Sequence, residues 1–600
     1  MAQGKLRVTA ANASTGDAVE KSVTVRPDGR EIVESSAQVF HGQTTLSLGL
    51  PPEALPGTAR AELKLYPNLL AHLAESIEAI LARPAGCAEQ VISVAYPSLL
   101  YLRYSKSTGA PPSAQSARAQ RYLEVGYQKL LALRAPSGGF TFWGSGEADV
   151  ALTAYAIQFL RDASGLIPID DSLVQEATSW LVGRMREDGS WQPRYGQDRP
   201  GDRSTAILTA YVVRVLSEEL KEQNSGGAKP AEQRPDAQST RQSVVRSSLM
   251  RALPFVARAA GEMDEPYLIA SYALAARNAG DSEAAGRALA RLRSLAREEG
   301  TGSYWALEAN SPFYSWGLPG RLETTALVLQ ALAGSRGAEE TAGDAQLISR
   351  GLLFLLKNQD EYGVWFSGHV TVHVLQAVVA LLGNGQLNAE PHSASVRVNG
   401  KDAFELDLPE TRAVSPPLVR DLSRFLHPGE NRVEIRVEGS NAGDLSAELV
   451  SGYYMPWAPG GRAQETVLRP GESESLRFAV RYSRTAARIG DAVECSVDAE
   501  RIGFHGYGMM VAEVGIPPGA EVDRDSLERA QADSRWALNH FEVQPDRILL
   551  YLWPAAGGTH LAFSFHARYA ENAQAPASIL YDYYNPLAQA LIAPVRFAVQ

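Results

Sequence analysis

The stretch GGFTFWGSGEADVALTAYAIQFL, residues 138–160, decides the fold, because its pattern recurs along the chain. Glycine and aromatic residues are followed by a short polar turn and then by a helix-forming segment. Similar units occupy residues 188–216, 302–333 and 362–382. Their helix starts recur at about fifty residues, which is long enough for two antiparallel helices per unit. Helix pairs that close on themselves form an α/α toroid, and an open solenoid is the alternative.

Carboxylates accompany these units near the expected helix starts, where a negative charge favours the positive end of the helix dipole. They are Asp149, Asp202 and Glu323. Within the same helical region, residues 221–242 are polar and rich in turn formers. We interpret that segment as a mobile insertion.

The segments on either side of the helical region have strand character. Residues 1–50, and the chain after about residue 390, alternate apolar and polar side chains in short runs separated by turn residues. Within the last block, DRDSLERAQAD, residues 523–533, predicts one short helix. The chain therefore combines strand-rich, helical and strand-rich parts, as expected of several domains in 600 residues.

Composition narrows the range of functions. The net charge of −11 and the absence of a basic cluster argue against a nucleic-acid partner. No run of about 18 apolar residues occurs, so no membrane segment is expected. The two cysteines, Cys87 and Cys495, lie in segments of different character, and nothing supports a disulfide between them. We expect Cys495 to pack as a small apolar residue in a strand.

The segment PAGCAEQ, residues 84–90, suggests covalent chemistry. Its proline and glycine indicate a turn that enters a helix, where a thiol is more acidic and more nucleophilic. The amide of Gln90, three residues after Cys87, lies on the same side of the first turn. Attack of the sulfur on the Gln90 carbonyl, with loss of ammonia, would give an internal thioester. The alternative is that Cys87 is simply a small buried hydrophobic residue.

This segment resembles the thioester signature of the α2-macroglobulin and complement superfamily, which reads Gly-Cys-Gly/Leu-Glu-Gln in most members. The chain has Ala88 at the variable position and keeps Cys87, Glu89 and Gln90, with Gly86 before them. Other stretches resemble the same family in the same order: residues 48–70, 138–160, 311–332, 502–520 and 579–586.

The resemblance implies a multidomain α and β architecture. It comprises an α/α toroid, the thioester domain, inserted in a CUB-like β-domain and followed by a β-sandwich similar to the macroglobulin receptor-binding domain. The expected boundaries are 1–55 and 391–462 for the two parts of the CUB-like domain, 56–390 for the toroid and 463–600 for the last domain. The chain is thus expected to be the C-terminal portion of a longer bacterial protein whose upstream macroglobulin domains and bait region precede it.

The resemblance also implies a function. Family members trap proteases: cleavage of a bait segment exposes the thioester, which acylates a lysine amine of the attacking protease. We therefore expect a protease inhibitor that is not an enzyme and needs no cofactor, acting outside the cytoplasm in the periplasm or after secretion. Cys87 and Gln90 would form the cross-link, and Gly86 and Glu89 would support it.

Thioesters hydrolyse in water, so aromatic residues are the natural shield. The candidates in the toroid recur at equivalent loop positions: Trp143, Tyr314, Trp316 and Trp365. The resemblance suggests that the C-terminal domain also packs over the site through Tyr581, Tyr583 or Tyr584. The alternative is that these tyrosines pack within their own β-sandwich.

The nucleophile is expected to be an amine. Complement proteins that acylate hydroxyls use a histidine about a hundred residues after the cysteine, and residues 187–211 here contain none. His369 is a competing candidate. His369 and His373 lie four residues apart on one helical face, as in a metal pair, but no third ligand is evident. We interpret both as packing or surface residues and predict no metal site.

Three other functions remain open at this point. A toroid-fold enzyme is one, although the Asp-rich motif that cyclases of this shape need is absent. The second is a binding module in which the cysteine is idle. The third is a surface-attachment protein that uses the thioester to bind a host.

Overall fold

The structure is a computed structural model of the 600-residue chain. It describes residues 2–12, 14–40, 42–67, 71–72, 75–76, 79, 86–108, 114–193, 203–224, 236–335, 343–360, 363–382, 392–408, 416–438, 445–457, 475–502, 508–535, 537–553, 555 and 557–600. The chain divides into two compact units, Met1–His72 with Leu387–Gly461, and Leu73–Gln386 with Arg462–Gln600. None of the described helices combines the length and hydropathy that a membrane span requires.

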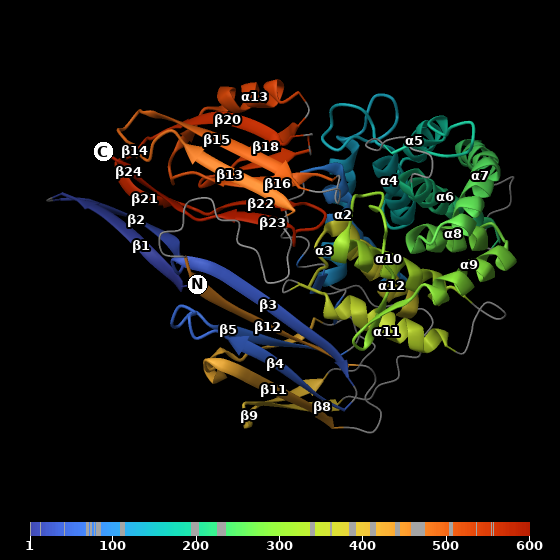
Figure 1. The fold of residues 1–600 in the computed structure, drawn as a ribbon, viewed down its shortest axis with the longest axis horizontal. Coiled ribbons are helices and arrows are strands. Elements are labelled where there is room, and N and C mark those ends of the chain that lie inside the picture. Colours follow the sequence, from blue (N-terminus) through green and yellow to red (C-terminus); the bar gives the residue numbers. More distant parts are fainter. Residues whose placement is uncertain are drawn as a thin grey trace. The chain divides into compact units, whose positions relative to one another are not determined.

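The first unit consists of antiparallel strands from both ends of the helical region (Figure 1). From the N-terminal side come β1 (Ala2–Ala11), β2 (Gly16–Val25), β3 (Gly29–Phe40), β4 (Gln43–Leu50) and β5 (Arg60–Tyr66). After the helical region come β8 (His392–Val398), β9 (Lys401–Leu408), β10 (Leu418–Asp421), the 3-10 turn η3 (Ser423–Phe425), β11 (Gly429–Glu438) and β12 (Leu445–Pro456).

The two segments fold together because their strands share sheets and a core. The sheet orders are β10-β5-β12-β3 and β4-β11-β8-β9, and β1 and β2 form a separate hairpin. Leu449 pairs with Leu63, and Val433 with Leu46. All four side chains belong to one buried cluster. The predicted β-domain interrupted by a helical domain is thus confirmed.

The second unit begins with a closed ring of inner helices. These are α2 (Ala88–Thr108), α4 (Val150–Ala163), α6 (Arg203–Asn224), α8 (Pro266–Asn278), α10 (Gly317–Ala333) and α12 (Gly368–Leu382). Each packs on the next, and α12 packs on α2, so the ring closes. Their C-terminal halves together line one cavity, which shows that the inner helices run in the same direction. The predicted toroid is confirmed and the open solenoid is excluded.

Outer helices cover this ring. They are α3 (Ala114–Leu131), α5 (Asp171–Gly183), α7 (Asp236–Glu262), α9 (Ser282–Ser294) and α11 (Asp344–Lys357), with a small hairpin of β6 (Arg297–Glu299) and β7 (Gly302–Tyr304). The segment predicted as a mobile insertion, 221–242, contains the end of α6 and the start of α7, and its residues 225–235 lie outside the described residues.

One hydrogen bond repeats in every unit of the sequence pattern. The backbone N–H of an aromatic residue donates to the hydroxyl of a threonine in the following inner helix. The pairs are Phe140 with Thr153 (3.0 Å), Trp191 with Thr209 (3.0 Å), Trp305 with Thr325 (3.1 Å) and Trp365 with Thr371 (3.0 Å). The indole N–H groups of the tryptophans donate to carbonyls of Leu181, Leu292 and Leu355, near the ends of α5, α9 and α11, each at 2.7 Å. The motif therefore joins each outer helix to the next inner one.

The C-terminal domain is a β-sandwich with one helix. Its elements are β13 (Leu476–Tyr482), β14 (Ala486–Ala487), β15 (Ala492–Arg501), β16 (Met510–Gly515), β17 (Glu521–Val522), α13 (Arg524–Asp533), β18 (Leu538–Val543), β19 (Arg547–Leu552), β20 (Thr559–His566), β21 (Glu571–Ala575), β22 (Ser578–Asp582), β23 (Gln589–Ile592) and β24 (Val595–Val599). The sheet orders are β13-β15-β20-β17, β14-β24-β21 and β18-β19-β16-β22-β23, around one apolar core.

Several local predictions can be compared with these elements. The predicted helix at 523–533 is α13, and Asp149 caps α4 by accepting from the Leu152 N–H at 3.0 Å. Cys495 is buried in the sandwich core as a small apolar residue, as predicted, and its thiol is free. Glu323 was assigned to a helix start, and this is wrong: it lies inside α10 and is fully buried. Asp202 lies outside the described residues.

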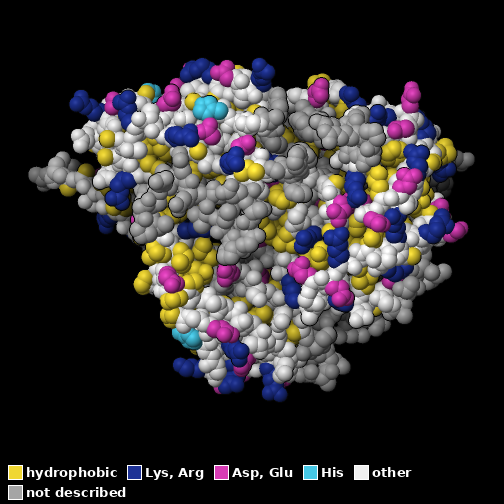
Figure 2. Space-filling view, viewed as in Figure 1, with side chains coloured by type: hydrophobic (Ala, Val, Ile, Leu, Met, Phe, Trp, Pro, Cys, Tyr) yellow, Lys and Arg dark blue, Asp and Glu magenta, His cyan; other side chains and the backbone are white. Residues whose placement is uncertain are grey.

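Charges on the surface are mixed in sign. On the face shown in Figure 2, basic and acidic side chains of the described residues are interspersed over both the helical and the strand-rich parts. Such mixing lets neighbouring surface charges offset each other.

The repeated threonine contact gives a stability prediction. Thr325→Val removes the acceptor of the buried Trp305 N–H without changing the side-chain volume, and should lower the free energy of unfolding of the toroid by about 1–3 kcal/mol. The matched control is Thr324→Val, because the neighbouring Thr324 hydroxyl is equally buried and has no hydrogen-bond partner among the described residues. Urea denaturation of both variants measures the difference. Equal stability of the two variants would contradict a bonding role for Thr325.

Candidate functional site

Cys87 lies directly before helix α2, as the sequence predicts. Its carbonyl accepts the Val91 N–H at 2.9 Å, and the N–H of Ala88 donates to the Phe142 carbonyl at 2.8 Å. The Cys87 side chain is fully buried. Pro84, which together with Gly86 led to the prediction of a turn, lies outside the described residues.

The side chain of Gln90 folds back toward Cys87. Its carbonyl oxygen Oε1 accepts the backbone N–H of Gly86 at 2.8 Å and that of Cys87 at 3.0 Å. Two donors on one carbonyl oxygen withdraw electron density from its carbon and stabilise the negative charge that forms when a nucleophile adds there. The structure thus brings Cys87 and Gln90 together in an arrangement that favours acyl chemistry at the Gln90 carbonyl.

The acidity of the thiol differs from the expectation based on the helix N-terminus. Burial, and next the charge of Glu89, raise the pKa of Cys87, although backbone hydrogen bonds act in the opposite direction. Desolvation disfavours the thiolate more than the helix end favours it. The prediction of an acidic thiol is therefore wrong for the closed protein.

Glu89 is fully buried and links the motif to the C-terminal domain. Its Oε1 accepts from the Ser93 hydroxyl at 2.8 Å, and its Oε2 accepts from the Tyr583 hydroxyl at 3.4 Å. Burial raises the pKa of Glu89 above that of an ordinary carboxyl. Burial also raises the pKa of Tyr583, with further contributions from Glu89 and Cys87. Tyr583 therefore lies at the motif.

Trp143 lies against Gly86. A Cβ atom added to Gly86 would lie 3.2 Å from Trp143 Cζ3, so the indole would have to shift by a few tenths of an ångström, and 3.5 Å from Glu542 Oε1, an ordinary contact. On the side of the C-terminal domain, the Trp143 ring stacks on His540 with centroids 4.6 Å apart and meets Tyr551 edge-on at 5.0 Å. Trp143 is therefore held between the motif and strands β18 and β19.

Asp582, at the end of β22, joins the two domains. Its Oδ2 accepts the indole N–H of Trp316 at 2.9 Å, a partly buried hydrogen bond. The same oxygen forms a buried ion pair with Arg501. Its Oδ1 accepts the backbone N–H groups of Tyr584 at 2.8 Å and Asn585 at 2.9 Å. One carboxylate thus fixes the loop that carries Tyr583 and holds it to the toroid.

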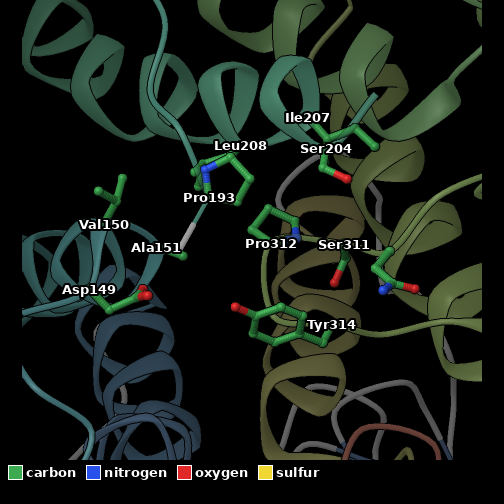
Figure 3. A pocket seen from close by; sticks show the side chains of 11 residues that line it. Asp149, Val150, Ala151, Pro193, Ser204, Ile207, Leu208, Ser311, Pro312 and Tyr314 are labelled. Carbon is green, nitrogen blue, oxygen red and sulfur yellow. The ribbon is translucent and has the colours of Figure 1, made fainter. Parts of the chain in front are cut away.

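Tyr314 and Tyr584 complete this contact. Tyr314 meets Trp553 at 5.7 Å and Tyr584 at 5.8 Å between ring centroids. Its φ of 60° is left-handed, a conformation that costs energy outside glycine. Tyr314 also lines a pocket beside the start of α4, where its hydroxyl points toward the side that holds Asp149 (Figure 3). The loop before α10 therefore uses strained backbone to direct this ring.

Two predicted shielding residues have other contacts. Trp365 is fully buried in the fourth repeat, where its hydrogen bonds are with Leu355 and Thr371. Trp365 therefore makes the same contacts as the corresponding tryptophans of the other repeats. These contacts give no support to a shielding role. Tyr581 lies in β22 and pairs with Val511 in the sandwich.

The two helical histidines have an acidic neighbour. His369 and His373 are buried, and Glu323 lies beside both. A third potential metal ligand is thus present, contrary to the expectation from sequence. Burial alone would raise the pKa of Glu323, but the neighbouring histidines hold it at about 2. Burial, and next the charge of His369, lower the pKa of His373, which favours the neutral form of its ring.

Sequence reasoning missed most of the C-terminal residues at this site. Asp582 lies within residues 579–586, one of the stretches that resemble the family, but only the tyrosines there were predicted to reach the site. His540, Tyr551 and Trp553 gave no signal, because strand alternation does not reveal which sheet face another domain covers.

Family models match two parts of the chain. A model described as the A-macroglobulin TED domain matches residues 62–381, more than half of the chain. A second, described as the A-macroglobulin receptor binding domain, matches residues 506–593.

Curated relatives are similar over part of their length. Thioester-containing protein 1 (allele S3) of Anopheles gambiae is 29% identical over 213 residues, which is 34% of this chain and 16% of that protein. Ovostatin of Gallus gallus is 24% identical over 375 residues, 60% of this chain and 24% of that protein. The chain therefore matches less than a quarter of the length of these relatives.

Solved structures share the fold across the whole chain. Native α2-macroglobulin from Escherichia coli, spanning domain MG7 to the C-terminus, aligns with a TM-score of 0.66 at 15% identity over 100% of this chain and 88% of that one. Salmonella α2-macroglobulin reacted with methylamine aligns with a TM-score of 0.64 at 17% identity, over 100% of this chain and 36% of that one.

With a closed helical toroid, a C-terminal β-sandwich docked at its Cys-Ala-Glu-Gln motif, and a TED-domain match over most of that toroid, the chain belongs to the α-macroglobulin family.

Proposed function

We propose that Cys87 and Gln90 form an internal thioester that traps proteases covalently. The thiol adds to the Gln90 side-chain carbonyl, the S–C bond forms, and the amide nitrogen leaves as ammonia after taking up the thiol proton. An amine of an attacking protease later adds to the same carbon. The new amide bond forms as the C–S bond breaks, and the amine's proton restores the Cys87 thiol.

The observation that carries this proposal is the pair of backbone donors on Gln90 Oε1. The Gly86 and Cys87 N–H groups, at 2.8 and 3.0 Å, are positioned to stabilise the oxyanion in both the forming and the opening step. A merely structural glutamine in this position would need no such pair, since water or one donor satisfies an amide oxygen.

Burial supports control of the reaction by conformation. Burial raises the pKa of Cys87, which makes its thiolate a poor leaving group while the site is closed. Movement of the C-terminal domain away from the motif would hydrate the sulfur and make the acyl group reactive. Trp143, Tyr583 and Tyr584, with Tyr314 and Trp316 behind them, are the proposed shield.

The proposal also requires a trigger. The curated relatives are several times longer than the matched segment, so cleavage of a bait segment elsewhere in the protein is the proposed signal. The partners are proteases, which present lysine amines, and the place of action is outside the cytoplasm. The protein would act as an inhibitor that reacts once.

The thioester predicts a definite mass change. Freshly purified protein should weigh less than the sequence mass by one ammonia. Methylamine should then raise the mass by one whole methylamine, to one CH2 group above the sequence mass, because Gln90 becomes its N-methylamide, and it should free one thiol at Cys87. Intact mass spectrometry and thiol titration measure both changes. Glycerol should be incorporated far less, because no histidine relay is proposed.

Two variants serve as controls for the mass experiment. Cys87→Ala should have the full sequence mass and ignore methylamine, whereas Cys495→Ala should behave as the wild type. Full sequence mass in unreacted wild-type protein would contradict the thioester, and glycerol incorporation equal to that of methylamine would contradict the amine preference.

Asp582 should control how well the thioester is protected. Asp582→Asn leaves Arg501 without its buried charge partner, a loss that costs about 3–5 kcal/mol for such pairs. The rate of methylamine incorporation should rise by about tenfold or more, since each 1.4 kcal/mol is tenfold. The control is Glu500→Gln, whose partner Arg477 is exposed. An unchanged rate in folded Asp582→Asn protein would show that this contact does not hold the shield.

Tyr583 should act through its ring more than through its hydroxyl. The hydroxyl contact with Glu89 is long, at 3.4 Å, so Tyr583→Phe should change the methylamine rate by no more than about threefold. Tyr583→Ala opens the site and should raise the rate by about tenfold or more. The time course of methylamine incorporation, measured by mass spectrometry of quenched samples, gives the rates of both variants. Equal rates for the alanine variant and the wild type would exclude Tyr583 from the shield.

A further inference from the structure

Three buried polar side chains meet inside the toroid, apart from the Cys87–Gln90 pair. Glu323 belongs to α10, and His369 and His373 belong to α12, one helical turn apart. Their exposed fractions are 0%, 0% and 2%. One ligand atom from each lies within 4.8 Å of the others. Buried polar groups in such a cluster need a shared partner.

The separations are too long for direct hydrogen bonds. Glu323 Oε1 lies 3.5 Å from His369 Nδ1 and 4.0 Å from His373 Nε2. Charge-assisted hydrogen bonds measure about 2.7–2.9 Å. By contrast, ligand atoms bound tetrahedrally at about 2.0–2.1 Å from zinc lie about 3.4 Å apart. The spacing therefore suits a bridging cation better than a direct ion pair, with the wider pair closing by small side-chain rotations.

The polar atoms of this cluster make no hydrogen bonds of good geometry. This holds for both Glu323 oxygens, both ring nitrogens of His369 and Nδ1 of His373 among the described residues, although the side chains of His369 and Ser315 lie close enough to Glu323 to interact with it. Apolar rings surround His369, with Phe313 at 4.2 Å and Tyr155 at 5.0 Å between centroids. Leaving such atoms unpaired away from water costs about 1–3 kcal/mol each. A bound cation would use their lone pairs.

The chemistry of the donors indicates which cation. Two imidazoles and one carboxylate are the donor set of many zinc sites, whereas calcium and magnesium prefer oxygen ligands alone. Histidines four residues apart on a helix present their rings to one ion. Glu89 lies within electrostatic reach of both His369 and Glu323 and adds a second carboxyl group near the site. The donor set therefore indicates a divalent transition-metal ion.

We propose that Glu323, His369 and His373 bind a divalent transition-metal ion of the zinc class inside the toroid. The ion joins α10 to α12, the last inner helix, which closes the ring by packing on α2. An ion that binds only the folded state stabilises it by mass action. The site is independent of the thioester, and its presence or absence leaves the proposal for Cys87 and Gln90 unaffected.

The test is metal content of the whole chain after loading. Because the ligands are buried, the protein is refolded, or expressed, with Zn²⁺ or Co²⁺, then desalted at neutral pH and analysed by elemental mass spectrometry. We expect about one metal ion per chain. The Co²⁺ form should show the intense visible absorption of a tetrahedral site, and the toroid should melt at a higher temperature with metal than without it.

A double variant assigns the ion to the cluster. His369→Gln with His373→Gln should lose the metal and the metal-dependent rise in melting temperature, whereas the exposed His427→Gln should keep both. Folded wild-type protein that carries no metal after loading would overturn the proposal, even if the double variant fails to fold. Metal content that is equal in wild type and folded double variant would overturn it as well, because the ion would then bind elsewhere.

Discussion

Exclusion of water from one side-chain carbonyl is the constraint on which the rest of this structure depends. The Gln90 carbonyl accepts two backbone N–H groups at the start of α2, which polarises it for attack by any nucleophile that can reach it. The same burial raises the pKa of the Cys87 thiol and so opposes thiolate release. Under the proposed function, activation and protection of the acyl group therefore depend on the same buried site, and hydration of that site would change one into the other.

The two domains of the second unit divide this work. The toroid supplies the inner-helix start that positions the motif, and repeated aromatic–threonine contacts fix the loops at that end. The C-terminal sandwich supplies the cover through a few specific contacts, of which the buried Asp582–Arg501 pair and the Trp316 N–H bond are the most polar. Removing one partner of such a buried pair leaves an uncompensated charge, so the pair is sensitive to any change on either side. Under the proposed function, these contacts would hold the cover closed until the C-terminal domain moves.

Much of this could be predicted from the sequence, and the remainder shows where local patterns stop being informative. Repeats and strand alternation predicted the toroid and the interrupted β-domain. The Cys-x-Glu-Gln spacing predicted that the Gln90 side chain lies beside Cys87, whose backbone N–H it accepts; the thioester itself stays a prediction. The acidity of Cys87 was misjudged because helix-end effects are local, whereas desolvation depends on the C-terminal domain. Glu323 was placed at a helix start, and the helix begins six residues earlier, at Gly317, so the carboxylate enters the core beside His369 and His373. Contacts between residues hundreds of positions apart, such as that of Trp143 with His540, leave no periodic pattern in the sequence from which they could be predicted.

An experimental structure of the unreacted protein at high resolution measures the central claim most directly. The account predicts continuous density between Cys87 Sγ and Gln90 Cδ, with the acyl oxygen held by the Gly86 and Cys87 N–H groups beneath Trp143 and Tyr583. Separate thiol and carboxamide groups in protein never exposed to amines or heat, with the same closed arrangement around them, would contradict it.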